Sequence, residues 1–140
     1  MATFTPLPWQ IAPWNDISPV VVISSGAGTG KSWLYLWKMV SYCLRYPGAL
    51  GLIVRKYQNS LRNSVIPELQ KIVPPSVIYE ATNSRFTFPN GSRIVLGGLK
   101  DAQQREKIRS IVGEKGGVDI ALMEEATQMT WDDKEEIEGR

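Results

Sequence analysis

A glycine-rich segment that follows a short apolar run constrains the fold of this chain more than any other feature. Residues 24–32 read Ser-Ser-Gly-Ala-Gly-Thr-Gly-Lys-Ser and come directly after the apolar residues 19–23. A buried strand that ends in such a turn and leads into a helix directs several backbone N–H groups and a helix amino terminus at one point. Because only an anion with several oxygens satisfies so many donors, the segment predicts a phosphate-binding loop.

The loop departs from the pattern G-x-x-x-x-G-K-[ST] at one position, where Ser25 replaces the first glycine. We predict that Lys31 reaches the terminal phosphates of ATP and that Ser32 contacts a bridging Mg²⁺ ion. The residues predicted to surround the nucleotide phosphates are Gly26, Ala27, Gly28, Thr29, Gly30, Lys31 and Ser32. The alternative is a glycine-rich turn that precedes Lys-Ser by chance, and the strand before and helix after the segment favour the loop.

Composition places the chain among ordinary globular proteins. Its 140 residues suffice for one domain, and 43% apolar with 21% charged residues excludes a disordered chain. No apolar stretch is long enough to span a membrane, and the amino terminus lacks a secretion signal, so we expect a soluble, unsecreted protein. One cysteine, Cys43, and no histidine argue against a structural zinc site, and Cys43 is expected in the core.

Charge is distributed unevenly along the chain. Residues 1–118 hold 14 Lys and Arg against 6 acidic residues, whereas residues 119–140 hold 2 against 8. The basic part suits phosphate groups of a nucleotide or of nucleic acid, although solvated surface lysines and arginines explain much of the excess.

The apolar pattern predicts alternating strands and helices after the loop. A helix over residues 33–44 ends before Pro47, and residues 49–54 form a buried strand. A second helix over residues 61–72 contains Pro67, which should kink it or stand in a first turn. The prolines of residues 1–19 predict an extended, non-helical lead-in that its tryptophans anchor.

The second half of the chain predicts a hairpin and a third strand. Residues 85–88 and 92–96 flank Pro89-Asn90-Gly91, and Asn-Gly between alternating segments is a strong hairpin signal. Residues 118–123 predict a buried strand that Glu124 and Glu125 follow, and open α/β sheets bind ligands at the carboxyl ends of their strands. We therefore expect Glu124 in the magnesium shell and Glu125 to activate the attacking water.

An acidic helix start is the alternative interpretation of Glu124 and Glu125, since acids are favoured there in any helix. The phosphate loop upstream favours the catalytic interpretation. Asp119 is expected inside the same strand and is the weaker metal candidate.

These features together resemble the ATPase domain of tailed-bacteriophage terminase large subunits, the motors that package viral DNA. The segments that carry the resemblance are Pro8-Trp9-Gln10, the loop 25–32, Leu52-Ile-Val-Arg-Lys56 with Gln58-Asn-Ser-Leu-Arg62, Phe88-Pro-Asn-Gly-Ser-Arg-Ile94, Gly97-Gly-Leu-Lys-Asp101 and Leu122-Met-Glu-Glu-Ala-Thr127.

The resemblance adds roles for two residues. It implies that Gln10 recognises adenine, the alternative being a surface residue beside a packed tryptophan. Some members carry an arginine inside the loop where this chain has Ala27, which makes Arg55 a candidate arginine finger for a neighbouring subunit. A structural ion pair or a DNA phosphate contact are the alternatives for Arg55.

The resemblance implies an α/β fold of the P-loop NTPase type, the additional-strand ATPase class. Its mainly parallel sheet is flanked by helices and carries an inserted β-hairpin. We expect residues 1–140 to be the amino-terminal part of the ATPase domain, with residues 1–19 as lead-in and 20–140 as P-loop core. The central coupling strand and the nuclease domain would be absent, which leaves the sheet incomplete and this fragment inactive or weakly active alone.

The function implied is ATP hydrolysis coupled to translocation of double-stranded DNA into the procapsid, in the cytoplasm of the host cell. Implied partners are the portal protein, the small terminase subunit and further copies in a ring, with no membrane. Two alternatives stay open: a helicase-like, nucleic-acid-dependent P-loop ATPase, and a nucleotide-binding or assembly module without hydrolysis.

Overall fold

The computed structural model describes residues 5–6, 8–15, 31–55, 59–98, 103, 106 and 117–123. At residues 31–32 and 59–63 it describes the backbone only. The predicted strand at 19–23, the loop at 24–30 and the Glu124–Glu125 pair lie outside these residues.

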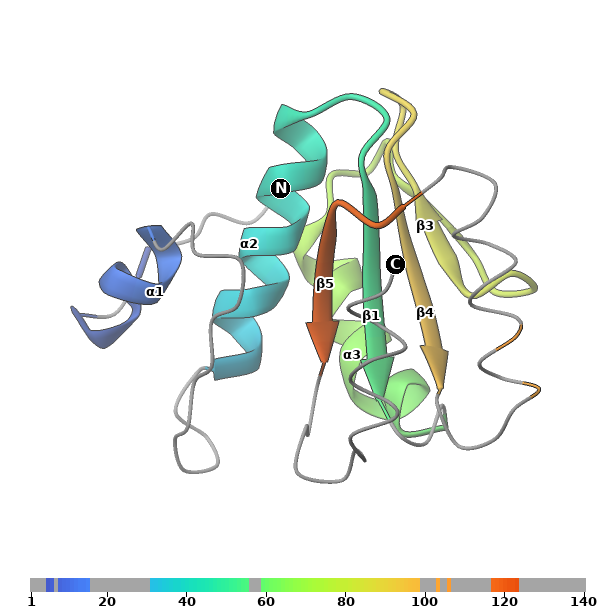
Figure 1. Cartoon of the computed structure of the whole chain (residues 1–140), viewed down its shortest axis with the longest axis horizontal. Coiled ribbons are helices and arrows are strands. Elements are labelled where there is room, and N and C mark those ends of the chain that lie inside the picture. Colours follow the sequence, from blue (N-terminus) through green and yellow to red (C-terminus); the bar gives the residue numbers. More distant parts are fainter. Residues whose placement is uncertain are drawn as a thin grey trace.

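One mixed sheet forms the centre of the described structure, with the strand order β2-β3-β4-β1-β5 (Figure 1). The strands are β1 (Leu50–Arg55), β2 (Ile78–Glu80), β3 (Arg85–Thr87), β4 (Arg93–Gly98) and β5 (Ile120–Met123). β1 runs parallel to both β4 and β5, whereas β2, β3 and β4 pair antiparallel. The predicted α/β fold, its parallel strands and its hairpin are confirmed, and β2 is an addition that the sequence analysis did not predict.

Two long helices, α2 (Lys31–Arg45) and α3 (Asn59–Ile72), pack on one face of this sheet. The buried residues of this main core, which includes Cys43 as predicted, are Leu36, Trp37, Met39, Val40, Cys43, Ala49, Ile53, Val65, Ile66, Leu69, Ile72, Val77, Phe86, Phe88, Ile94, Leu96 and Leu122. Leu50, Leu52, Val54 and Val95 are buried on the opposite face. Both faces of β1 are therefore apolar, as expected for a parallel strand inside an α/β sheet.

Gly51 lets α2 approach β1 closely. A Cβ atom at this position would lie 3.1 Å from the Met39 sulfur and 3.4 Å from Ile94, so a side chain would force Met39 to shift. The glycine in the middle of this strand is thus explained by helix packing.

Pro67 lies inside α3, which continues to Ile72. Its side chain is exposed, so the ring faces away from the core. The prediction that the helix ends before Pro74 is confirmed.

Residues 8–15 of the lead-in are helical, which corrects the prediction of an extended segment there. A 3-10 helix, η1 (Pro8–Gln10), continues into α1 (Ile11–Asn15). Pro13 is the third residue of α1, and the first four N–H groups of a helix have no partner within it. Its missing N–H therefore costs no hydrogen bond, and the predicted anchoring holds for Trp14, which packs against the main core.

A turn of the β3–β4 hairpin, residues 88–92, binds the carboxyl end of α2. The Asn90 side-chain amide donates to the Cys43 carbonyl at 2.8 Å. The Ser92 hydroxyl accepts the Ala49 N–H at 3.1 Å and lies 2.8 Å from the carbonyls of Cys43 and Tyr46. We call this set of contacts the helix latch.

Glycine at position 91 fits the backbone of this turn. Its N–H donates to the Phe88 carbonyl at 3.0 Å and its φ angle is 89°. This is a three-residue hairpin loop with a left-handed glycine, instead of a two-residue Asn-Gly turn.

At the far end of the hairpin, Arg85 donates to the carboxylate of Glu80. This hydrogen bond, with a second from Asn83, lowers the pKa of Glu80 below its ordinary value. The pair crosses the β2–β3 register at its last position.

We predict that Ser92→Ala lowers the free energy of unfolding by about 2 kcal/mol, because it leaves buried backbone groups without their partner. Urea denaturation measures this change. Ser76→Ala, at an exposed position, is the matched control and should stay within about 0.5 kcal/mol of wild type. Equal stability of the two variants would contradict a structural role for the helix latch.

Candidate functional site

The amino end of α2 and the carboxyl ends of β1, β4 and β5 lie at the same edge of the sheet (Figure 1). The helix latch fixes the carboxyl end of α2 beside the start of β1. α2 and β1 run in opposite directions (Figure 1). Their lengths are similar, since the 15 residues of α2 span about 22 Å and the six residues of β1 span about 20 Å. Lys31, the first residue of α2, is thereby level with the carboxyl edge.

Arg55 is the last residue of β1 and stands at this edge. Arg55 is half-buried and pairs with Gly98 of β4. The residue before it, Val54, pairs with Met123, the last residue of β5. β1 is an interior strand of the described sheet. The structure thus places Arg55 at the middle of the edge that Lys31 approaches.

Gln10 lies in η1 and is only 2% exposed. This burial contradicts the alternative of an ordinary surface residue, because glutamine side chains are mostly exposed. The neighbouring Trp9 is 38% exposed, so the tryptophan beside Gln10 is the more exposed of the two.

The remaining site predictions lie outside the described residues. These are Gly26, Ala27, Gly28, Thr29, Gly30, Glu124 and Glu125, together with the side chains of Lys31 and Ser32. The described structure confirms the helix that begins at Lys31 and the strand that ends at Met123, directly before Glu124 in the sequence.

Asp119 is not placed to be a metal ligand of this edge. It precedes β5, whose first residue is Ile120, and so stands at the amino end of the strand. Its carboxylate accepts the Leu50 N–H at 2.8 Å, and its own N–H donates to the Leu50 carbonyl at 2.9 Å. The sequence expectation of a position inside the strand is therefore wrong, and the role of the side chain is to join β5 to β1.

Lys38 is a residue that the sequence analysis did not single out. Its ammonium group donates to the Pro13 carbonyl at 2.7 Å and joins α1 to the middle of α2. A bond between positions 25 apart leaves no local sequence signal that could have revealed it.

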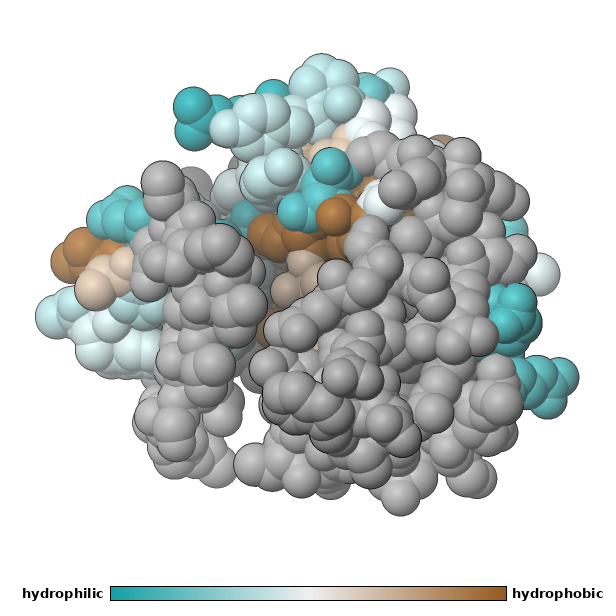
Figure 2. Space-filling model, in the orientation of Figure 1, coloured by the Kyte–Doolittle hydropathy of each residue, from teal (hydrophilic) through white to brown (hydrophobic). Residues whose placement is uncertain are grey.

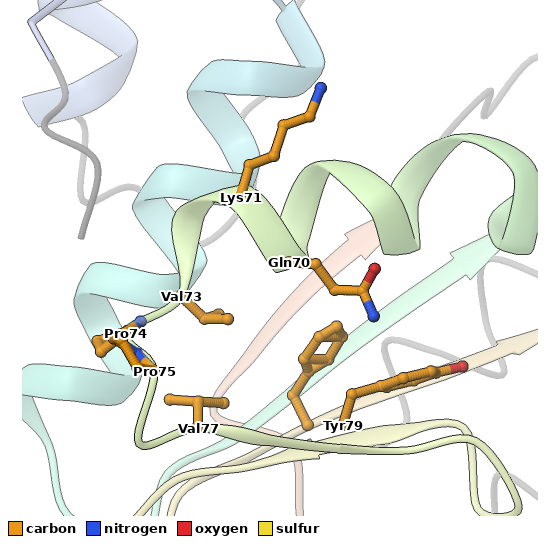
Figure 3. Close-up of a pocket in the computed structure, with 8 residues that line it drawn as sticks. Gln70, Lys71, Val73, Pro74, Pro75, Val77 and Tyr79 are labelled. Carbon is orange, nitrogen blue, oxygen red and sulfur yellow. The ribbon is translucent and has the colours of Figure 1, made fainter.

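A pocket of about 420 Å³ lies away from this edge, between the end of α3 and the hairpin (Figure 3). The side chain of Gln70 extends toward Tyr79, whereas that of Lys71 points away from the other labelled residues. The lining residues are Gln70, Lys71, Val73, Pro74, Pro75, Val77, Tyr79 and Phe86. None of them is a predicted nucleotide-site residue, so this pocket is separate from the candidate site.

Two features are absent from the described part of the chain: a membrane-spanning helix and a cluster of metal-binding side chains. No helix there has the length and apolar character needed to cross a membrane. Nor does that part contain a cluster of three or more His, Cys, Asp or Glu side chains that could hold a metal ion.

Parallel central strands, helices packed on the sheet and a helix that opens with Lys-Ser at the carboxyl edge define an α/β fold of the P-loop NTPase type. The profile of the phage terminase large subunit family matches residues 18–140, and the chain belongs to this family.

The structure is also similar to that of the large terminase from a thermophilic bacteriophage, with a TM-score of 0.68 and 17% identity. The match covers 82% of this chain and 29% of that chain, so this chain spans less than a third of its length. At this identity the likeness shows the fold alone. No match was found among curated proteins.

We predict that Asp119→Ala lowers the free energy of unfolding by about 1–2 kcal/mol, because the Leu50 N–H loses a charged acceptor. Asp119→Asn keeps a side-chain oxygen that can accept this bond and should recover most of the loss. Thermal and urea denaturation with and without Mg²⁺ measure the effect. A destabilisation that appears only when Mg²⁺ is present would contradict the structural role.

Proposed function

We propose that this chain is the ATP-binding and hydrolysing part of a viral DNA-packaging motor, and that residues 1–140 form the amino-terminal part of its ATPase domain. The observation that carries the proposal is the alignment of the α2 amino end with the carboxyl ends of β1 and β5. A glycine-rich segment precedes that helix and two acids follow β5 in the sequence. Membership in the terminase family supports the same function.

In the proposed site, the loop 26–30 and the amino end of α2 surround the phosphates of ATP. Lys31 neutralises charge on the terminal phosphates, and the Ser32 hydroxyl and Glu124 would hold Mg²⁺ through oxygen ligands, which this ion prefers. A bound Mg²⁺ supplies charge neutralisation at the reacting phosphate. Glu125 accepts a proton from the attacking water or orients it. Catalysis is then mostly positioning and electrostatic stabilisation.

The metal assignment rests on the polarity of β5. Of the acids that border this strand, Asp119 stands at its amino end and its carboxylate is bound to the Leu50 N–H. Glu124 follows the carboxyl end, where open α/β sheets bind their ligands. The donor set of one hydroxyl and one carboxylate fits a hard cation that keeps several waters.

Arg55 is retained in the proposal as a positive charge at the carboxyl edge. Its place at the end of an interior strand, between β4 and β5, supports a contact with the nucleotide of its own chain. An arginine finger for a neighbouring subunit would be better served by a position on an edge strand or a protruding loop.

By family membership we further propose double-stranded DNA, the portal protein and the small terminase subunit as partners, and a ring of identical subunits as the working state. The activity would take place in the host cytoplasm, at the procapsid. The chain is shorter than the terminase it matches, so these partners are proposed for the full-length protein.

We predict that Glu125→Gln in the full-length protein keeps ATP binding but lowers the rate of hydrolysis about 100-fold or more, because an amide cannot accept the proton. Phosphate release measures turnover, and titration with a fluorescent ATP analogue measures binding. Glu68→Gln, on the partly exposed face of α3, is the matched control and should hydrolyse ATP at the wild-type rate. Normal turnover in Glu125→Gln would remove Glu125 from this role.

We predict that Lys31→Ala weakens ATP binding by about tenfold or more, because a charge-assisted contact with the phosphates is lost. Isothermal titration of ATP in the presence of Mg²⁺ measures the affinity. Lys71→Ala removes an exposed lysine on α3 and should leave the affinity unchanged. If Lys31→Ala binds ATP like wild type, the phosphate-loop assignment is wrong. Binding that depends on Lys31 without any hydrolysis would instead support a nucleotide-binding module.

A further inference from the structure

The helix latch holds α2 at the end that is remote from the candidate site. Asn90 donates to the Cys43 carbonyl at 2.8 Å, and the Ser92 hydroxyl lies 2.8 Å from the carbonyls of Cys43 and Tyr46. The last carbonyl groups of a helix have no partner within it, so these contacts satisfy the end of α2. Figure 2 shows mostly hydrophilic surface at this end of the molecule, at the top of the view. Polar contacts thus hold α2 at the edge of the sheet that lies opposite the candidate site.

Hydrogen bonds fix the position of α2 along its axis better than apolar packing does. Along the middle of the helix, Leu36, Met39 and Val40 are buried in the main core. Apolar contacts are non-directional, and packed helices can shift past a neighbour by about 1–2 Å. A hydrogen bond, in contrast, weakens steeply when its angle or distance changes. The several bonds of the helix latch therefore oppose sliding of α2 along β1.

A helix transmits a shift at one end to the other, because its backbone is hydrogen-bonded from turn to turn. α2 runs without a break from Lys31 to Arg45 and contains neither glycine nor proline, the residues that most often bend a helix. Lys31 lies about 22 Å from the helix latch and level with the carboxyl edge of the sheet (Figure 1). The helix latch therefore sets how far the amino end of α2 extends toward that edge.

We propose that Asn90 and Ser92 are positioning residues for phosphate binding. Through α2 they fix the level of Lys31, the first residue of the helix, at the carboxyl edge. The inference rests on the proposed function, in which Lys31 contacts the terminal phosphates of ATP. Such a contact depends on distance, and a misplacement of about 1 Å can cost a factor of about 100 in rate. Loss of the helix latch therefore weakens phosphate binding from the opposite edge of the sheet.

The experiment measures the affinity of the full-length protein for inorganic triphosphate with Mg²⁺, by isothermal titration. Triphosphate carries no base, so the measurement reports on phosphate contacts alone. Asn90→Ala removes the donor to the Cys43 carbonyl, and we expect about fivefold weaker binding. Ile72→Val, which removes a buried methylene group of α3, is the matched control because it also destabilises the fold. Its affinity should stay within about twofold of wild type.

Asn90→Asp separates the contact with the helix from the shape of the hairpin turn. The side-chain oxygen of Asn90 accepts the Ser92 N–H at 3.0 Å, and aspartate keeps this acceptor but has no N–H to donate to Cys43. We expect Asn90→Asp to bind triphosphate as weakly as Asn90→Ala does. Wild-type affinity in Asn90→Asp would overturn the inference. Thermal denaturation checks folding, and if Asn90→Ala does not fold, Asn90→Asp takes its place.

A double variant, Asn90→Ala with Lys31→Ala, tests whether both ends of α2 act on one contact. Substitutions this far apart usually have additive effects. If the helix latch acts by positioning Lys31, the double variant binds triphosphate no more weakly than Lys31→Ala alone. Additive losses overturn the inference, because they indicate a general structural role.

Lys31→Ala alone separates this inference from the function beneath it. If Lys31→Ala binds triphosphate weakly and Asn90→Ala binds it like wild type, only the positioning role is wrong. If Lys31→Ala binds it like wild type, the phosphate-loop assignment is wrong and the inference falls with it.

Discussion

The helix latch is the interaction on which the rest of the described structure depends. The last carbonyl groups of a helix have no partner within it, and buried ones must find another. In α2 the Cys43 carbonyl is met by Asn90 and Ser92, side chains 47 and 49 positions further along the chain. One short turn thus satisfies the helix end and ties it to the hairpin.

The same contacts fix the sheet. Ser92 accepts the Ala49 N–H, and the Arg93 N–H donates to the Ala49 carbonyl at 2.8 Å, so the β1–β4 ladder starts at the helix latch with Leu50 opposite Arg93. A one-residue slip would turn every side chain of β1 to the other face. α2 ends and β1 begins at the helix latch, and the two elements have similar lengths. The amino end of α2 therefore lies level with the carboxyl edge of the sheet. Contacts at the amino edge of the sheet therefore determine the geometry of its carboxyl edge.

Much of this fold could be predicted from the sequence because its signals are local. Helical spacing indicated α2, the apolar run indicated β1, and Asn90-Gly91 indicated the hairpin. The prediction for residues 8–15 was wrong because Pro8 and Pro13 occupy positions where a helix tolerates proline. β2 has three residues and an exposed Ile78, too little for a periodic signal. The bond from Lys38 and the helix latch join distant positions, and a single sequence carries no information about such pairs.

Asp119 shows how the polarity of a strand decides which end of the sheet an acidic side chain can serve. Asp119 directly precedes β5, and Glu124 directly follows it in the sequence. At the amino end, Asp119 accepts the N–H of Leu50 and joins β5 to β1, a purely structural task. The strand then delivers the chain, in parallel register with β1, to the edge beside Arg55 just before Glu124. From the sequence alone, Asp119 is already the weaker of the two candidates for Mg²⁺. The register of β5 adds a structural reason, because Asp119 precedes the end of the strand that is remote from the amino end of α2.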